Sequence, residues 1–93
     1  MIKVIIERYV AEDLFEHYEK ASKATLQLAM QASGFISGEA LSNVYDANHR
    51  VVIATYRTLQ DWHRWHASEA RKDMMEQITP MLEHEEKITV WEH

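Results

Sequence analysis

FISGEALSNVYDANHRVVIATYR (residues 35–57) contains two strand-like runs with one turn signal between them. Both runs, Phe35 to Tyr45 and His49 to Arg57, carry apolar residues at period two. The intervening Asp46-Ala47-Asn48 is rich in turn-forming residues, so we predict a β-hairpin. Apolar residues fall on both of its faces, which indicates that helices cover one face of the sheet and that something else covers the other.

The segment that precedes the hairpin predicts one strand and one helix. Ile2, Val4 and Ile6 recur at period two, which predicts a strand with one strongly apolar face. From Glu12-Asp13 to Ser33-Gly34 the apolar residues follow steps of three and four, and acidic residues stand at the start. This pattern predicts a long helix.

The segment that follows the hairpin predicts two helices and a last strand. Thr58 is a suitable N-cap for the first helix, and Ser68 begins a second, short helix that runs towards Pro80. His84-Glu85-Glu86-Lys87 is interpreted as a solvated connection, and Lys87 to Glu92 alternates like a strand. The order β-α-β-β-α-β predicts an α+β fold, a ferredoxin-like unit with a four-stranded antiparallel sheet.

Length and composition exclude several classes of protein. The 93 residues suit a single domain over residues 1–93, since one core normally needs about 50 to 200 residues. The net charge of −5, with scattered basic residues, argues against nucleic acid and anionic membranes as partners. No apolar run approaches the roughly 20 residues that cross a bilayer. The lack of cysteine and of a signal-peptide pattern in Met1 to Val10 predicts a cytoplasmic protein.

Trp62-His63-Arg64-Trp65-His66 places two indoles and two imidazoles within five residues of a predicted helix. Large aromatic surfaces beside titratable nitrogens are typical of small-molecule pockets. Trp62 and Trp65 equally suit a helix face that packs into the core. His63 and His66 suit a general base, since imidazole titrates near pH ~6.5, or a half-exposed surface position. Without a third ligand in a recognisable position they predict no metal site.

Other polar and adaptable candidates lie outside that stretch. Asn43 and Tyr45 share one face of a predicted strand, where polar groups among apolar neighbours need hydrogen bonds from protein or ligand. Arg71 is suited either to neutralise an anionic substrate or to form a solvated ion pair with the acidic residues beside it. Met75 is one of several methionines that suit a core or the wall of a hydrophobic pocket.

Several motifs resemble those of one known family. They are Gly34-Phe35-Ile36-Ser37, Asp61-Trp62-His63-Arg64-Trp65-His66-Ala67-Ser68 with Arg71 after it, and Ile78-Thr79-Pro80-Met81-Leu82. With the order of elements, they make nearly the whole chain resemble the antibiotic biosynthesis monooxygenase family of dimeric α+β barrel proteins. The resemblance implies a homodimer whose two sheets pack face to face, with a ligand pocket between the sheet and the helices of each subunit.

The resemblance also implies chemistry with O2. Enzymes of the family act without a cofactor on phenolic or quinol substrates, or they degrade bound haem. The haem-degrading branch has a tryptophan at the position that resembles Trp65, an asparagine on the first strand and a histidine ten residues after the tryptophan. In this chain the first strand offers Glu7 and Arg8, and Met75 stands at the histidine position. The cofactor-free branch is therefore the better match.

These observations together predict a homodimeric monooxygenase that oxidises an aromatic, phenolic or quinol-like hydrophobic small molecule with O2 and no cofactor. The predicted catalytic residues are His66 or His63 as proton acceptor, Trp65, and Asn43, which holds the anion. The predicted substrate-contacting residues are Trp62, Tyr45, Tyr56, Arg71 and Met75. Two alternatives remain open: a haem-binding or haem-degrading monooxygenase, with His66 or His63 as the iron ligand, and a non-catalytic dimer that binds a small molecule.

Overall fold

The computed structural model describes residues 1–92, which form one antiparallel sheet and three α-helices. The strands are β1 (Ile2–Tyr9), β2 (Phe35–Asn43), β3 (Asp46–Tyr56) and β4 (Lys87–Glu92), in the spatial order β2-β3-β1-β4. The helices are α1 (Phe15–Ala29), α2 (Leu59–His66) and α3 (Glu69–Ile78), which continues into a 3₁₀ turn at Thr79–Met81. The predicted α+β fold and its βαββαβ order are confirmed. No helix in the described part of the chain is long and apolar enough to span a membrane.

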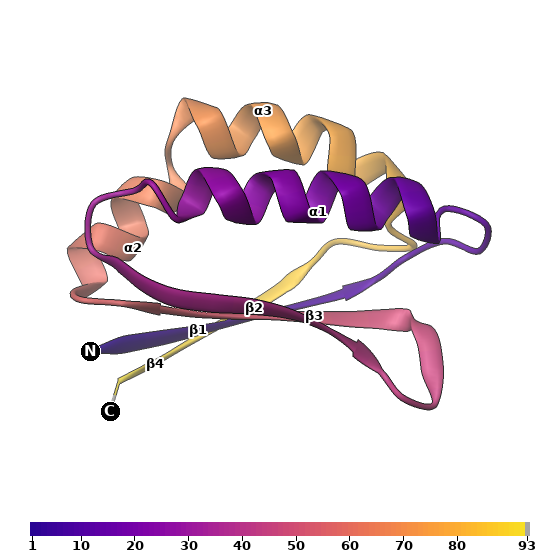
Figure 1. Cartoon of the computed structure of the whole chain (residues 1–93), viewed down its shortest axis with the longest axis horizontal. Coiled ribbons are helices and arrows are strands. Elements are labelled where there is room, and N and C mark those ends of the chain that lie inside the picture. Colours follow the sequence, from indigo (N-terminus) through magenta and orange to yellow (C-terminus); the bar gives the residue numbers. More distant parts are fainter. Residues whose placement is uncertain (93) are drawn as a thin grey trace.

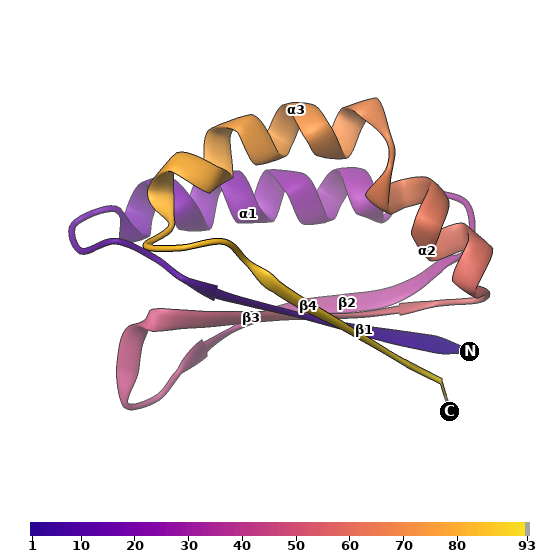
Figure 2. The same ribbon diagram turned by 180° about the vertical axis from the view of Figure 1, so that it is seen from behind.

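All three helices cover the same face of the sheet, as Figure 1 shows from one side and Figure 2 from behind. The alternation in β1 explains this arrangement, because Ile2, Val4 and Ile6 are buried under the helices and the residues between them point away. Ile6 lies opposite Val52 of β3, and directly opposed residues of an antiparallel pair share a face. The two central strands therefore offer one continuous apolar surface to the helices.

The opposite face of the sheet, here called the open face, carries a second band of apolar side chains. These residues are Ile5 in β1, Leu41 in β2, Val51 and Ile53 in β3, and Trp91 in β4. Trp91 is 58% exposed, and no segment within residues 1–92 lies over the band. The expectation that apolar residues line both faces of the hairpin is confirmed.

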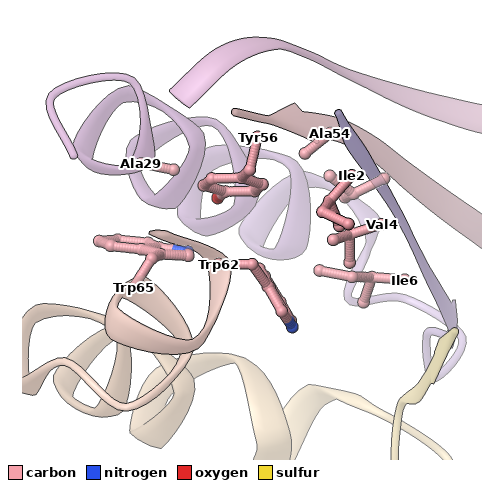
Figure 3. Packing of buried hydrophobic residues seen from close by; sticks show 9 residues of the cluster. Ile2, Val4, Ile6, Ala29, Ala54, Tyr56, Trp62 and Trp65 are labelled. Atoms are coloured by element: carbon pink, nitrogen blue, oxygen red, sulfur yellow. The ribbon is translucent and has the colours of Figure 1, made fainter. Parts of the chain in front are cut away.

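The main core lies between the sheet and α2 (Figure 3). Trp62 and Trp65 of α2 and Tyr56 at the end of β3 are buried there against the apolar face of β1. A second cluster, around Tyr18 of α1 and Ile78 of α3, fills the other end of the same layer. Truncating a buried tryptophan costs about 3 to 5 kcal/mol, so α2 is a main source of the stability of this small domain.

Local sequence signals fix where α2 and α3 begin. The hydroxyl oxygen of Thr58 accepts a hydrogen bond from the Asp61 N–H at 3.1 Å, and that of Ser68 accepts one from the Arg71 N–H at 3.2 Å. Each bond satisfies one of the free N–H groups of the first helical turn. Both predicted N-caps are confirmed.

The predicted turn of the hairpin is wrong. The turn consists of Val44-Tyr45, and Asp46-Ala47-Asn48 belongs to β3. The Asn43 side-chain oxygen accepts a hydrogen bond from the Tyr45 N–H at 2.8 Å, which closes the chain two residues earlier than predicted. Asp46 makes a similar bond, from the Asn48 N–H at 3.0 Å, but inside a strand whose pairing is shifted at Ser42/Asn43.

The predicted helix before the hairpin is longer at both ends than α1. Asp13 has a left-handed backbone with φ of 68°, so α1 begins two residues later, at Phe15. The helix ends at Ala29, and residues 30–34 form turns that lead to Gly34, whose φ is 84°. The left-handed backbone of Asp13 excludes it from the helix, and that of Gly34 belongs to the turns that lead from the helix into β2.

Candidate functional site

A small cavity of about 30 Å³ lies between the sheet and the helices. Side chains from β1, β3 and all three helices line it, and most of them are aliphatic or aromatic. A wider groove of about 310 Å³ runs along the outside between α1 and β2. Ser22 and Leu26 of α1 border both spaces, so they separate the cavity from the groove.

Three aromatic side chains form one wall of the cavity. The centroids of the Tyr56 and Trp62 rings are 5.5 Å apart, and the ring planes are tilted by 58°. Trp65, three residues further along α2, also lines the cavity (Figure 3). Phe35 meets the other side of Tyr56 edge-on, at 5.5 Å. These contacts hold the Tyr56 ring in one orientation. Of the predicted site residues, the structure thus brings Tyr56, Trp62 and Trp65 together.

Two buried arginines and one carboxylate form the polar end of the cavity. Arg8 Nε donates to Glu86 Oε1 at 2.8 Å, and Arg71 Nη2 donates to Glu86 Oε2 at 2.7 Å. Arg8 also donates to the Tyr18 hydroxyl at 3.1 Å. Arg8 and Arg71 line the cavity and Glu86 does not. The cavity therefore faces two positive charges that share a single counter-ion behind them.

The ionisation of Glu86 and Tyr56 reflects this cluster. Burial disfavours the ionised Glu86 carboxyl, but the charges and hydrogen bonds of Arg8 and Arg71 outweigh it, so the pKa of Glu86 lies below its usual value. Burial raises the pKa of Tyr56 to about 12, although the charge of Arg71 acts in the opposite direction. At neutral pH Glu86 is an anion and Tyr56 keeps its proton.

Several hydrogen-bond donors reach the cavity without a protein partner. Among residues 1–92, no hydrogen bond uses the Tyr56 hydroxyl or the indole N–H groups of Trp62 and Trp65. No buried polar side-chain atom of the described residues is sealed without a partner. The three groups therefore keep some accessible surface, and their side chains line the cavity, so they are available to a ligand there.

His63 and His66 lie in the last turn of α2, outside the lining of the cavity. The His66 ring packs against Trp62 at 5.2 Å between centroids, so it stands directly behind the aromatic wall. Partial burial and the positive charge of Arg71 lower the pKa of His66, which keeps the imidazole neutral at physiological pH. A neutral imidazole at this place is able to accept a proton. His63 is exposed.

The remaining predicted site residues lie elsewhere. Asn43 and Tyr45 are at the hairpin tip, at the end of the sheet opposite to α2 (Figure 1). Asn43 is bonded to His49 at 3.0 Å between Nδ2 and Nδ1, and Tyr45 is 97% exposed. The Met75 sulfur lies 3.7 Å from Arg8 Nη2, on the outer side of the charged cluster. The structure does not bring these three side chains into the cavity.

Arg8 and Glu86 are the residues of the site that the sequence analysis missed. The interpretation of residues 84–87 as a solvated connection is wrong for Glu86, whose side chain is only 11% exposed. The predicted alternative of a solvated pair between Arg71 and its helix neighbours is also wrong, because Arg71 is buried and pairs with Glu86. Arg8 carried a usable signal, since it continues the buried period-two series of β1.

No three His, Asp or Glu side chains of residues 1–92 come together in a way that could hold a metal ion. The polar groups around the cavity belong to arginine, tryptophan, tyrosine, serine and threonine, and with two guanidinium groups and no carboxylate they suit anions and oxygen acceptors rather than cations. The fold and the site thus define a small α+β domain with a buried, aromatic and positively charged cavity.

The comparison with protein families assigns this domain to one of them. The model of the antibiotic biosynthesis monooxygenase family matches residues 1–77, most of the chain. The protein belongs to the antibiotic biosynthesis monooxygenase family. A search of curated proteins finds no match to the sequence.

Solved structures with the same fold include members of this family. A crystal structure described as an antibiotic biosynthesis monooxygenase has a TM-score of 0.92 at 13% identity, covering 100% of this chain and 98% of the other. A putative antibiotic biosynthesis monooxygenase from Nitrosomonas europaea gives 0.92 at 15% identity, with 100% and 98% coverage. SnoaB, a cofactor-independent oxygenase from Streptomyces nogalater, gives 0.87 at 13% identity, with 99% and 92% coverage. At these identities the structures establish the fold.

Proposed function

We propose that the protein is a homodimeric monooxygenase that uses O2 without a cofactor to oxidise a phenolic or quinol-like aromatic compound. The observation that carries this proposal is the cavity itself, where an aromatic wall meets two buried arginines. Family membership and the structural similarity to SnoaB, a cofactor-independent oxygenase, support it.

The reaction needs little from the protein because the substrate supplies the electrons. A phenolate transfers one electron to O2, and the resulting phenoxyl radical and superoxide combine and take up a proton to form a hydroperoxide. Loss of water then leaves a quinone, so one phenol and one O2 give one quinone and one H2O. The enzyme must favour the ionised substrate, remove its proton and exclude bulk water.

The side chains around the cavity suit these three tasks. Arg8 and Arg71 keep the cavity positive, which favours an ionised substrate. Trp62 and Trp65 offer an apolar surface for the ring and indole N–H groups for its oxygens. His66, which packs against Trp62 and has a lowered pKa, is the proton acceptor, and because it lies outside the cavity lining it takes the proton through a bridging water molecule. Asn43 and Tyr45 have no role in this cavity, since they lie at the other end of the sheet.

The cavity must open before a substrate enters. A space of about 30 Å³ holds about one water molecule, whereas a ligand pocket usually measures about 300 Å³ or more. The groove between α1 and β2 adds about 310 Å³, and Ser22 and Leu26 line both spaces. Movement of Leu26 into solvent joins them and gives a site large enough for one or two aromatic rings.

Haem suits this donor set less well. A haem site needs an axial ligand, and no histidine is among the residues that line the cavity. Met75 stands outside the cavity, beside Arg8. The proposal therefore assigns no cofactor to the reaction.

The test is oxygen consumption by the purified protein on a panel of hydroquinones and polycyclic phenols, with metal and haem content measured beforehand. We expect turnover without cofactor, a fall of about 100-fold in His66→Ala, and a smaller fall in Trp65→Phe, which keeps the apolar ring but loses the N–H donor. Arg64→Gln, an exposed change on the same helix, serves as the control and keeps the wild-type rate.

Uptake that does not exceed the uncatalysed rate for any member of the panel would contradict the proposal. Binding of a panel member without turnover, seen as a rise in melting temperature, would instead support the non-catalytic role in small-molecule binding.

A further inference from the structure

The charged cluster beside the cavity has more positive than negative charge. Within residues 1–92, Glu86 is the only carboxylate that pairs with Arg8 and Arg71, and each arginine takes one of its two oxygens. The residues that line the cavity include both arginines and no Asp, Glu or His. One positive charge therefore remains without a counter-ion on the side that faces the cavity, and buried charges are stable when they are paired.

Arg71 has unused hydrogen-bonding capacity at the same place. A guanidinium offers five N–H donors in a planar fork. Among residues 1–92, the Arg71 side chain has one hydrogen bond, from Nη2 to Glu86, although the residue is only 7% exposed. Arg8, in contrast, already contacts Glu86, Tyr18 and Met75. Arg71 is thus the arginine that is free to bind a ligand.

The other free groups around the cavity are donors as well. They are the hydroxyl groups of Tyr56 and Ser22 and the indole N–H groups of Trp62 and Trp65, all from side chains that are more than nine-tenths buried. A set of donors with a net positive charge is complementary to an anion with several acceptor oxygens. The lining contains no carboxylate or imidazole, so the group that anchors the ligand beside the arginines must already be ionised at neutral pH. At neutral pH a carboxylate meets that condition and an ordinary phenol does not.

We propose that the cavity selects aromatic hydroxy acids, with the substrate carboxylate bound by Arg71 and the ring packed against Trp62 and Trp65. This inference rests on the proposed function and names the substrate class of the same site. The planar fork of Arg71 matches the two oxygens of a carboxylate, and the aromatic wall begins next to it.

The test is equilibrium binding under nitrogen, followed by quenching of tryptophan fluorescence, with 1-hydroxy-2-naphthoate and its methyl ester as a matched pair. Without O2 the measurement does not depend on turnover. We expect the acid to bind about tenfold to a hundredfold more tightly than the ester, the range that one charge-assisted hydrogen-bonding group contributes. Arg71→Gln should remove this preference and leave the affinity for the ester within about threefold.

Two further variants separate recognition from folding. Arg64→Gln removes an exposed charge of the neighbouring helix and should leave the preference intact. Arg71→Lys keeps the charge but loses the fork, so the preference should fall between those of the wild type and Arg71→Gln. Far-ultraviolet circular dichroism and thermal melting of every variant show whether the fold persists. If Arg71→Gln does not fold, the comparison of acid and ester binding by the wild-type protein still tests the proposal.

The proposal is overturned if the wild-type protein binds acid and ester equally, or if the acid fails to bind at millimolar concentration. It is distinguishable from the proposed function. Selective binding of the acid without oxygen uptake leaves the substrate class standing and removes the oxygenase role. Oxygen uptake with hydroquinones, without a preference for the acid, supports the oxygenase role and overturns the proposed substrate class.

Discussion

Glu86 is the residue on which the charged end of the cavity depends. Replacing it by glutamine leaves Arg8 and Arg71 as two buried like charges without an anion between them. Removing one partner from a buried ion pair costs about 3 to 5 kcal/mol, so we expect Glu86→Gln to lower the free energy of unfolding by about 3 kcal/mol. Urea denaturation measures the loss. Glu85→Gln, at the exposed neighbouring position, is the matched control, and an equal loss in both variants would contradict the assignment.

The same carboxylate makes stability depend on pH. The pKa of Glu86 is lower in the folded protein than in the unfolded chain, so its contribution is present above the unfolded value, about 4.3, and disappears as the pH falls through the folded value. We therefore expect the difference in melting temperature between wild type and Glu86→Gln to be constant from about pH 8 to about pH 6 and to shrink below about pH 4. A difference in melting temperature that grows on acidification would have the opposite sign and would refute this prediction.

At the scale of single residues, the sequence predicted which side chains are buried better than it predicted which side chains they contact. Arg8 occupies the next inward position after Ile2, Val4 and Ile6, so alternation alone places its charge under the helices. Its partner Glu86 is 78 residues away, in a connection without periodicity. A contact of that range is set by how β1, α3 and the segment before β4 pack, and no local pattern encodes it.

Gly34 fixes the position of α2 and lends itself to a test at the level of the element. It has φ of 84°, and a methyl group on it would overlap the carboxyl group of Asp61, which belongs to the N-terminal turn of α2. We expect Gly34→Ala to cost about 2 to 3 kcal/mol, from left-handed strain together with displacement of the capped turn. Chemical denaturation gives the value.

Gly38→Ala is the control for this change. Its φ is ordinary, and the new methyl group would meet only the tips of the Phe35 and Leu26 side chains, at 2.9 and 3.0 Å. These flexible tips are able to move, so the cost should stay below that of Gly34→Ala. Equal losses of unfolding free energy in the two variants would mean that Gly34 does not specifically fix the position of α2.

Leu26 of α1 is the barrier between the cavity and the outer groove. Leu26→Trp fills the groove next to the barrier, so we expect binding of 1-hydroxy-2-naphthoate to fall at least about tenfold, while Leu26→Ala should increase the association rate. Stopped-flow tryptophan fluorescence measures the association with Leu26→Ala, and calorimetry measures the affinity for Leu26→Trp. Leu28→Trp, an exposed change on the same helix, is the control. Unchanged binding in Leu26→Trp would place the access route elsewhere.

At the scale of elements, the sequence predicted what is decided within a few residues. Thr58 and Ser68 bond N–H groups three positions ahead, and both helices begin where these caps predict. The hairpin turn was not predictable in this way, because Val44-Tyr45 and Asp46-Ala47-Asn48 both adjoin a side chain that stabilises a turn. The register between β2 and β3, which is shifted at Ser42/Asn43, decides between them.

At the scale of the whole molecule, the order of elements followed from periodicity, and the site did not. Each strand and helix carries its own pattern, and the resulting βαββαβ order leaves few ways to pack. The cavity instead takes side chains from five elements, so it exists only once they are packed. Four of the residues predicted to form one site do meet there: Tyr56, Trp62, Trp65 and Arg71. Asn43 and Tyr45 lie at the hairpin tip, outside the cavity.

The open face of the sheet gives the last prediction, that two copies pair through it. A domain of this size buries only about 60 to 65% of its unfolded surface. The open face carries half-buried Ile and Val side chains in the middle of the sheet and exposed Leu41 and Trp91, and such an apolar band is costly unless it is covered. Family membership supports pairing of two sheets face to face. We expect the wild-type protein to be a dimer at micromolar concentration, as measured by light scattering after gel filtration.

Ile53 lies in a central strand and points to the open face, opposite Ile5, so Ile53→Lys places a charge in the middle of the proposed interface. We expect this variant to be monomeric and less stable, since an unpaired lysine in an apolar contact costs several kcal/mol. Met30→Lys makes the same kind of change at an exposed position beyond the end of α1, on the helical side, and should remain dimeric. A monomeric wild type, or a dimer that survives Ile53→Lys, would mean that something other than a second sheet covers this face.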